Sequence, residues 1–403
     1  MGRITTRRPI TAAGALLAGT AMAQAGGVER NPQTTAMLFE EGTYLEFGYT
    51  FSNPGVSGWQ VFDPDDYSLP LPTFSGARSG DVAPSFSHYS LAFRTDLDDA
   101  LSLAIILDEP IGASVDYAAN GFTPGYLYRL GAGSQAELSS EQITVAARYE
   151  MPNGFSVYGG LRAVSFEGQV ELFNGSGGLG NPLGRYLLDA EADTELGYMI
   201  GAAYERPDIA LRVALTYYSE TAHDVAATET TDLNGTRATE FETRIPQQVL
   251  LEAQTGVAEG TLVFGSVRWT DWTEFEIAPP DYFDDVTGGR ALVDYEKDVW
   301  TWSIGGARVL TDQWTLLGSL TYEAEQDVFS GNLGPTDGRT SVGIAARFTE
   351  GPIRITGGIN YSWIGDAETE APSLGGTVPE GTQFSSFTDN DAVSLGLRVG
   401  FSF

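Results

Sequence analysis

Eight arginines lie in segments whose residues alternate between apolar and small or polar side chains. Each of them falls on the face opposite the apolar one. Around Arg212, for example, Leu211 and Val213 fall on one face of an extended chain and Arg212 falls on the other. If the aliphatic face meets lipid, all eight point into an interior: Arg94, Arg148, Arg162, Arg212, Arg268, Arg347, Arg354 and Arg398. Guanidinium groups bind carboxylates strongly where water is partly excluded, so this set predicts a cationic collar that draws the carboxylate of a substrate inward.

The same arginines also have a purely structural interpretation. They can neutralise interior carboxylates, including Glu29, Glu40, Glu41 and Glu46 of the amino-terminal segment, and so fix that segment in place. The interiors of membrane barrels are polar and normally contain such charges. The two interpretations are compatible, and the sequence leaves both open.

Catalysis, cofactors and a resident metal ion find little support. There are two histidines, His88 and His223, no cysteine, and no Ser-His-Asp spacing or glycine-flanked nucleophile. The acidic runs 63–66 and 281–285 have the hard oxygen ligands that calcium prefers, and they could bridge to lipopolysaccharide through divalent ions, but they lack a regular calcium-loop spacing. We therefore expect no enzyme activity, no cofactor and no metal site, and we interpret the acidic runs as solvated loops.

The alternation that orients the arginines recurs along the whole chain and predicts an all-β protein. Fourteen segments have this pattern, and most of them reach the roughly 9–11 residues of a tilted membrane strand. They are Thr43–Phe51, Ser85–Thr95, Ala100–Asp108, Glu137–Tyr149, Phe155–Gln169, Tyr186–Tyr204, Ile209–Ser219, Glu240–Thr255, Thr261–Thr273, Val299–Val309, Trp314–Glu323, Ser341–Phe348, Ile353–Trp363 and Asp391–Phe403. We expect a transmembrane antiparallel β-barrel. Its aromatic interfacial belts would contain Tyr44, Tyr149, Trp269, Trp300, Trp302, Tyr361 and Trp363.

Connections between these segments alternate between short and long. Short turns such as Met151–Gly154 and Arg206–Asp208 alternate with long segments such as Ser52–Pro84 and Gly365–Asn390. Outer-membrane barrels have short periplasmic turns and long extracellular loops, so both termini are expected in the periplasm. Three arginines, a short apolar stretch and Ala21-Met22-Ala23 predict a cleaved secretory signal. The expected division is a signal peptide over 1–23, a short plug segment over 24–42 and the barrel over 43–403.

The charge balance limits the partners. The chain has 54 acidic and 22 basic residues, for a net charge of −32, so nucleic acid is not an expected partner. Lysine occurs once, as Lys297, and every other cation is arginine, which favours fixed bidentate contacts with carboxylates. We expect a monomer in contact with outer-membrane lipid and lipopolysaccharide.

Several motifs resemble those of FadL-type long-chain fatty acid transporters. One motif is similar to the region where that family passes from plug to barrel. It reads Gly27-Val28-Glu29-Arg30-Asn31-Pro32-Gln33 and is followed by Ala36–Phe39. The family usually has Asn-Pro-Ala here, whereas this chain has glutamine, Gln33, in place of the alanine. Further similarity lies in Ile106–Ala113, Ile245–Gln248 and Arg268–Phe275. The resemblance implies a barrel that takes up hydrophobic molecules and holds them in apolar pockets. It also implies a plug formed here by Glu29, Arg30, Asn31 and Pro32, in a hatch much shorter than the family's.

Pro110 and Gly112 mark a candidate lateral opening. Proline cannot donate a hydrogen bond to a β ladder, and in the resembled family a kink in the third strand lets an apolar ligand leave through the wall. The alternative is that the third strand simply ends at the rim after Asp108, and we favour it from the sequence alone. Pro246 allows the same two interpretations.

The sequence therefore predicts a passive outer-membrane transporter for a hydrophobic small-molecule ligand, with long-chain fatty acids as the expected class. A porin-like channel for small hydrophilic solutes is the main alternative, and a structural or adhesive barrel is a third. Steady ion conductance distinguishes a porin from a path that is closed to ions.

Overall fold

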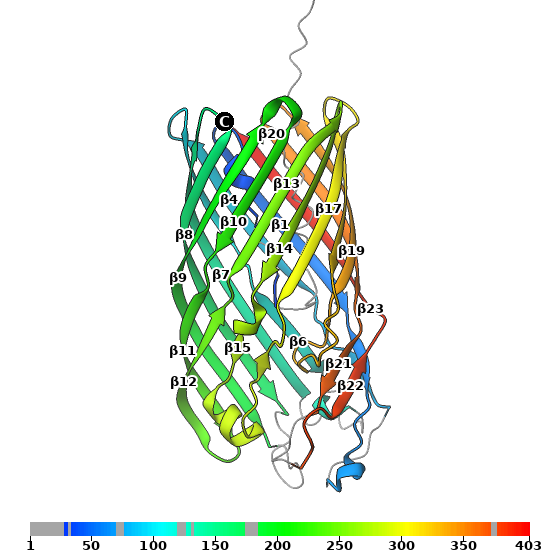
Figure 1. Ribbon diagram of the computed structural model, residues 1–403. Coiled ribbons are helices and arrows are strands. Elements are labelled where there is room, and N and C mark those ends of the chain that lie inside the picture. Colours follow the sequence, from blue (N-terminus) through cyan, green and yellow to red (C-terminus); the bar gives the residue numbers. More distant parts are fainter. Residues whose placement is uncertain are drawn as a thin grey trace, which may run out of the picture.

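The protein is a closed antiparallel β-barrel, as predicted (Figure 1). The computed structural model describes residues 28–30, 34–69, 76–118, 126–129, 133–173, 184–371 and 377–403. Seventeen strand segments make fourteen wall strands, because three wall strands are each built from two segments. In order around the wall they are β1 (Tyr44–Gly55), β4 (Phe86–Asp96), β5 (Leu101–Asp108) with β6 (Gly112–Ala118), β7 (Gly133–Glu150), β8 (Phe155–Leu172), β9 (Tyr186–Arg206), β10 (Leu211–Tyr218) with β11 (Thr221–Thr231), β12 (Gly235–Ile245) with β13 (Gln248–Ala258), β14 (Thr261–Thr270), β17 (Val299–Val309), β18 (Trp314–Glu323), β19 (Arg339–Glu350), β20 (Ile353–Ile364) and β23 (Asn390–Ser402).

The first and last strands close the wall. β1 pairs antiparallel with β23 from Tyr44 opposite Ser402 to Gly55 opposite Asp391. The Phe403 N–H also donates to the Thr43 carbonyl at 2.9 Å. Every strand of the wall thus has a neighbour on both sides along at least part of its length, and closure removes the two free edge strands that an open sheet would present in lipid.

Alternation places apolar side chains outside and polar ones inside. In β23, Val393, Leu395 and Leu397 are exposed, whereas Ala392 and Ser394 are buried. The same pattern leaves an exposed apolar surface on every face of the barrel wall, including Trp300, Trp302, Tyr322 and Trp363. A barrel in lipid requires this inversion of the usual soluble arrangement.

Tyr44 corrects one expectation for the interfacial belt. Its side chain is buried inside the barrel, where its hydroxyl donates to Glu46 at 3.0 Å. Phe47 and Tyr49 of the same strand face outward, so the even-numbered Tyr44 must face inward. The prediction that Tyr44 belongs to the belt is wrong.

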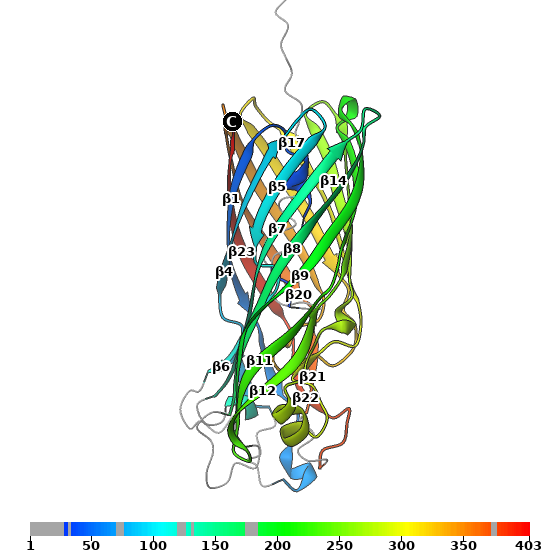
Figure 2. The same ribbon diagram turned by 90° about the vertical axis from the view of Figure 1, so that its left-hand side faces the viewer.

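Several wall strands extend beyond their predicted ends. β7 and β8 each span 18 residues and β9 spans 21. These strands extend the sheet toward the end of the barrel that carries the long connections, at the bottom of Figure 2. The seventh wall strand likewise continues from β10 into β11, and β11 pairs with β12. Alternation alone does not show where lipid ends, because a strand continues equally well in water.

The long connections carry small sheets of their own. β21 (Ala367–Glu370), β22 (Gln383–Phe387), β2 (Ser57–Gln60) and β3 (Arg78–Asp81) form one, and β15 (Glu276–Ile277) pairs with β16 (Val293–Asp294). Buried aromatic side chains such as Tyr117, Tyr126 and Phe384 pack between them. These elements form a cap at the loop end of the barrel (Figures 1 and 2). None of the helices in the described ranges is long and apolar enough to cross a membrane.

Candidate functional site

The amino-terminal segment lies inside the barrel and is held there by wall residues. Its short helix η2 (Ala36–Phe39) is buried, and a carboxylate of β13 meets the start of that helix. The Glu252 side chain accepts hydrogen bonds from the Thr34 hydroxyl at 3.0 Å, from the Thr35 hydroxyl, and from the Thr35 N–H at 3.3 Å. This buried carboxylate satisfies donors that a helix start otherwise leaves without partners.

Phe39 makes cation–π contacts with two of the predicted arginines. The guanidinium carbon of Arg148 lies 4.3 Å from the centre of the Phe39 ring, and that of Arg212 lies 4.4 Å from it. A cation over an aromatic face is attracted by the ring quadrupole, so both contacts stabilise the position of Phe39. Arg148 further donates to the Leu38 carbonyl at 3.4 Å and pairs with Glu150 at 2.6 Å.

Three more of the arginines contact the amino-terminal segment directly. Arg94 donates to the Gly42 carbonyl at 2.6 Å. Arg354 pairs with Glu40 at 2.9 Å, and Arg268 pairs with Glu29 at 2.7 Å. Five of the eight predicted arginines therefore contact residues of the amino-terminal segment. These contacts fit the structural interpretation, in which the arginines fix that segment in place.

The other three arginines bind the wall. Arg162 donates to the Gln142 side chain at 2.7 Å and to the Ser219 carbonyl at 3.1 Å. Arg347 donates to the Thr356 hydroxyl at 3.2 Å, and Arg398 pairs with Glu46 of β1 at 3.2 Å. All eight side chains thus lie inside the barrel in contact with protein groups.

Pro110 interrupts the third wall strand without ending it. β5 stops at Asp108 and the strand resumes as β6, which pairs with β7 from Gly112 opposite Ser139. The interpretation that the strand ends at the rim after Asp108 is wrong. β4 pairs with β5 as far as Leu91 opposite Leu107, and no ladder joins β4 to β6. One side of the third strand is therefore without its wall partner beyond Leu107.

The amino-terminal segment occupies the place of the missing partner. The Arg30 N–H donates to the Pro110 carbonyl at 3.0 Å, the Gly112 N–H donates to the Val28 carbonyl at 2.9 Å, and Glu29 forms a bridge with Ile111. Of the predicted plug residues, Glu29 and Arg30 thus lie at the interruption of the wall pairing. Asn31 and Pro32 lie outside the described residues.

Gly112 allows the Arg30 side chain to cross the opening. A Cβ atom at Gly112 would lie 2.6 Å from both Cδ and Nε of Arg30, which is too close for any side chain. The Arg30 guanidinium continues over the Phe86 ring at 4.6 Å from its centre. Only glycine permits this close approach, so Gly112 fits an arginine laid across the gap.

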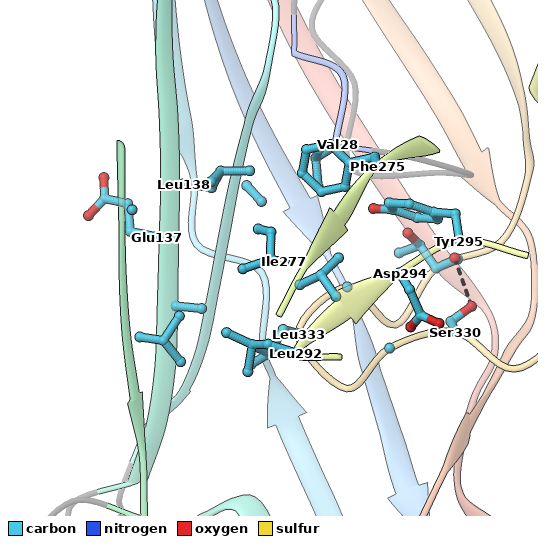
Figure 3. A pocket seen from close by; sticks show the side chains of 18 of the residues that line it. Val28, Glu137, Leu138, Phe275, Ile277, Leu292, Asp294, Tyr295, Ser330 and Leu333 are labelled. Atoms are coloured by element: carbon cyan, nitrogen blue, oxygen red, sulfur yellow. Dashed lines mark hydrogen bonds between the residues drawn. The ribbon is translucent and has the colours of Figure 1, made fainter. Parts of the chain in front are cut away.

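An apolar cavity lies on one side of the amino-terminal segment (Figure 3). It encloses about 1020 Å³ of empty space, part of it open to solvent. Its apolar lining includes Val28, Phe166, Phe275, Ile277 and Leu333, which come from the amino-terminal segment, the wall and the cap. A hollow with a mostly apolar lining suits a hydrophobic small molecule.

The polar lining of the cavity is acidic. Asp294, Glu296 and Asp337 contribute carboxylates, and no arginine, lysine or histidine is among the described residues that line it. The carboxylate of Glu137 points away from the cavity (Figure 3). Partial burial, followed by nearby carboxylates including Glu276, raises the pKa of Asp294. An anionic ligand would meet repulsion here, whereas an uncharged one would not.

A second, smaller hollow lies by Arg30. It has about 400 Å³ of empty space and is lined by Arg30, Phe86, Gly112 and Val115 among others. Ala113 and Thr336 border both hollows. The Arg30 side chain and Val28 thus stand where the large cavity meets the interrupted part of the wall.

Most cap residues of the cavity escaped sequence reasoning, apart from Phe275, which ends the Arg268–Phe275 motif of the family resemblance. Leu292 and Tyr295 lie in the long connection after the acidic run 281–285, where no strand period marks them. Their only signal was the aromatic and aliphatic content of that connection. Within the described ranges, no group of three or more potential metal ligands occurs.

Comparison with known proteins agrees with the geometry of the barrel and its cavity. A search of curated proteins finds no match to the sequence. Solved structures with a similar fold include a FadL homologue of Pseudomonas aeruginosa, with a TM-score of 0.74 and 15% identity over 98% of this chain and 99% of that one. The toluene transporter TodX of Pseudomonas putida has a TM-score of 0.60 and 12% identity over 94% and 96% of the two chains. The toluene transporter TbuX of Ralstonia pickettii has a TM-score of 0.59 and 13% identity over 91% of each.

The family model described as outer membrane protein transport protein (OMPP1/FadL/TodX) matches residues 6–403. The predicted resemblance is confirmed over nearly the whole chain. The protein therefore belongs to the OMPP1/FadL/TodX family, whose members cross the bacterial outer membrane as β-barrels and transport hydrophobic compounds.

Proposed function

We propose that the protein passively transports uncharged hydrophobic molecules across the outer membrane, without cofactor or chemistry. The observation that carries this proposal is the apolar cavity, whose described lining offers carboxylates but no cation. Transfer of apolar surface from water into such a cavity is favourable by roughly 25 cal/mol per Å². A ligand without negative charge gains this energy without meeting repulsion from Asp294, Glu296 and Asp337.

The proposed route leaves the cavity through the wall at Pro110 and Gly112. The amino-terminal segment closes this route with backbone hydrogen bonds to Pro110 and Gly112 and with the Arg30 side chain. Breaking them requires only residues 28–30 to move, because β6 keeps its ladder with β7. The ligand would then pass from the large cavity to the small hollow beside Phe86.

Long-chain fatty acids are the second candidate ligands, favoured by the interior arginines. In that case Arg94, Arg148, Arg162, Arg212, Arg268, Arg347, Arg354 and Arg398 would guide the carboxylate. Each of them already contacts a protein group, and five contact the amino-terminal segment, so an acid would have to displace existing partners. The acidic cavity and the occupied arginines together favour the uncharged ligand.

We further propose a monomer with both termini in the periplasm and the cap facing the outside. The short turns and the carboxyl terminus lie at one end of the barrel, and the long connections lie at the other (Figure 1). That arrangement is usual for barrels exported through the periplasm. Lipid then surrounds the exposed apolar surface, and lipopolysaccharide contacts the acidic cap through divalent ions.

A comparison of three ligands tests the proposal. Binding and uptake are measured for an aromatic hydrocarbon, a long-chain fatty acid and the methyl ester of that acid, alongside ion conductance in a planar bilayer. We expect uptake of the hydrocarbon and the ester, weak uptake of the acid, and little conductance. Preferential uptake of the acid that is lost in Arg148→Gln and Arg212→Gln would support the fatty acid candidate instead. Steady conductance without ligand binding would contradict both and indicate a porin.

A further inference from the structure

The barrel wall has a second interruption, between β9 and β11. β9 pairs with β10 up to Met199 opposite Tyr218, and with β11 from Ala190 opposite Ala227. Between these pairs, residues 191–197 of β9 and 220–226 of the facing strand form no ladder, and all of them are described residues. β9 remains paired with β8 and β11 with β12, so only this one seam lacks its backbone bonds.

The facing strand bends at the level where this interruption starts. β10 ends at Tyr218 and β11 begins at Thr221, while the next strand breaks at Pro246 and Gln247 between β12 and β13. Ser219 makes the last two contacts with β9 before the interruption, because its N–H donates to the Tyr198 carbonyl and its hydroxyl accepts from the Tyr198 N–H, both at 2.9 Å. The hairpin β11–β12 is therefore joined to the rest of the wall through a bend shared by two strands.

Side chains replace the missing ladder. His223 is fully buried, and its Nδ1 atom lies 3.0 Å from Oδ2 of Asp193 on the other side of the interruption. Its Nε2 atom lies 2.9 Å from the Thr221 hydroxyl. The Thr221 contact lies within β11 and positions the ring, so the His223–Asp193 contact is the one that bridges the seam, and side-chain motion alone can break it.

This interruption lies next to the apolar cavity. Ala190 is the last residue of β9 paired before the gap, and it lines the cavity. Phe166 also lines the cavity, and its ring centre lies 5.9 Å from that of His223. The cavity therefore reaches both interruptions of the wall, one through Ala113 and the other through Phe166 and Ala190.

The outer side of this interruption suits passage of an apolar molecule. Leu196 and Tyr198 are exposed beside it, which extends the apolar outer surface of the barrel up to the gap. Ala192, Ala222 and Ala226 are exposed within it and have only a methyl group. A ligand emerging here would pass these small side chains, with the exposed Glu191 and Asp224 beside them, before it meets the apolar surface.

We propose that the interval between β9 and β11 is a second lateral passage for apolar ligands, closed by the Asp193–His223 contact. This inference rests on the proposed function, because it assumes that the cavity holds such ligands. Unlike the opening at Pro110, this passage opens without any movement of the amino-terminal segment. The two passages would connect one cavity to two sides of the barrel.

Two cysteine locks separate the passages, and the natural chain has no cysteine to interfere. Glu29→Cys with Ile111→Cys locks the amino-terminal segment across its bridge with β6. Thr194→Cys with Ala222→Cys locks the second interval, since these exposed residues adjoin Asp193 and His223. Ala202→Cys with Leu215→Cys is the matched control in an intact ladder between β9 and β10. Glu29 with Ile111 and Ala202 with Leu215 are opposed residues of antiparallel segments, which lie within disulfide reach. Formation of the Thr194–Ala222 disulfide is verified by mass spectrometry before uptake is measured.

The measurement is uptake of the uncharged dye N-phenylnaphthylamine by cells with the full-length protein in their outer membrane. With the segment lock oxidised, we expect uptake that is reduced but clearly above that of cells without the protein. With both locks oxidised, uptake should fall to that of cells without the protein and recover on reduction. The control lock should leave uptake unchanged. In the segment-locked protein, His223→Ala should increase uptake.

Three results would overturn the inference. They are complete loss of uptake with the segment lock alone, equal uptake with one lock and with both, and no effect of His223→Ala in the segment-locked protein. Absence of uptake by the natural protein would instead count against the proposed function, so the two failures are distinguishable.

Discussion

Arg268 and Glu29 form an ion pair of 2.7 Å inside the barrel, although 239 residues separate them in the sequence. Arg268 belongs to β14, whereas Glu29 bridges to Ile111 on the third wall strand. The amino-terminal segment therefore spans the barrel, with its backbone on one wall and its carboxylate on another. This pair helps to keep the segment across the opening at Pro110.

The first prediction concerns this pair. Arg268→Gln leaves the carboxylate of Glu29 without its cation in a mostly buried position, and removal of one partner of a buried pair typically costs about 3–5 kcal/mol. We expect faster hydrogen exchange at residues 28–30 and 110–112, measured by mass spectrometry. The double variant Glu29→Gln with Arg268→Gln should recover part of the protection. Equal exchange in the natural protein and both variants would show that the pair does not hold the segment.

A second prediction concerns Gly112. In Gly112→Ala, the new methyl group would displace the Arg30 side chain, because only 2.6 Å separates its position from Arg30 Cδ. We expect greater dye uptake with the barrel still folded, as judged by heat-dependent migration in gels. Gly357→Ala in β20 is the matched control, since an added Cβ there has no atom within 4 Å. Unchanged uptake in Gly112→Ala would contradict the role of Arg30 as a barrier to the ligand.

Phe39 provides a third prediction. Phe39→Ala removes both cation–π contacts, each worth about 0.5–2 kcal/mol, and brings Arg148 and Arg212 into direct repulsion. We expect the segment containing η2 to become susceptible to added protease while the barrel stays resistant. Phe47→Ala, which truncates an exposed phenylalanine of β1, serves as control. Protection of the segment in Phe39→Ala equal to that in the control would contradict the role of these contacts.

The fourth prediction uses the raised pKa of Asp294. As the pH falls, this carboxyl gains its proton at a higher pH than an ordinary aspartate, so the cavity loses negative charge there. A fatty acid that is still ionised should then bind more tightly as the pH falls, whereas an uncharged ester should show no such change. Asp294→Asn should bind the acid more tightly at neutral pH and lose this part of the pH dependence. Titration with a fluorescent ligand at several pH values checks both expectations. Identical pH profiles of binding in the variant and the natural protein would show that Asp294 does not cause the pH dependence.

Much of the wall was predictable because alternation and turn lengths are local signals. Those signals identify fourteen strands and the inward direction of Arg212 and its counterparts, and the family resemblance indicates the amino-terminal plug. The same alternation should also have assigned Tyr44 to the interior, where aromatic composition suggested a belt. Pro110 was misjudged because its neighbours after Gly112 lie in a segment that looks like a loop until its pairing with β7 is known.

The cavity and the second interruption could not be predicted in this way. Phe166, Phe275 and Tyr295 meet only when the cap folds over the wall, and no spacing in the sequence encodes that contact. The Asp193–His223 contact depends on a ladder that stops and resumes, which residue types do not reveal. Local patterns determine strands, whereas these features depend on how distant strands are brought into register.

The seam between β1 and β23 constrains how the barrel can be assembled. Tyr44 pairs with Ser402, so closure joins the first strand to the last, and the wall remains an open sheet until the end of the chain is available. A chain lacking β23 would leave both β1 and β20 with unpaired backbone groups, a template for association with other chains. Enclosure of the amino-terminal segment is complete only once this seam has formed, so sealing of the barrel and capture of its own plug are one event in biogenesis.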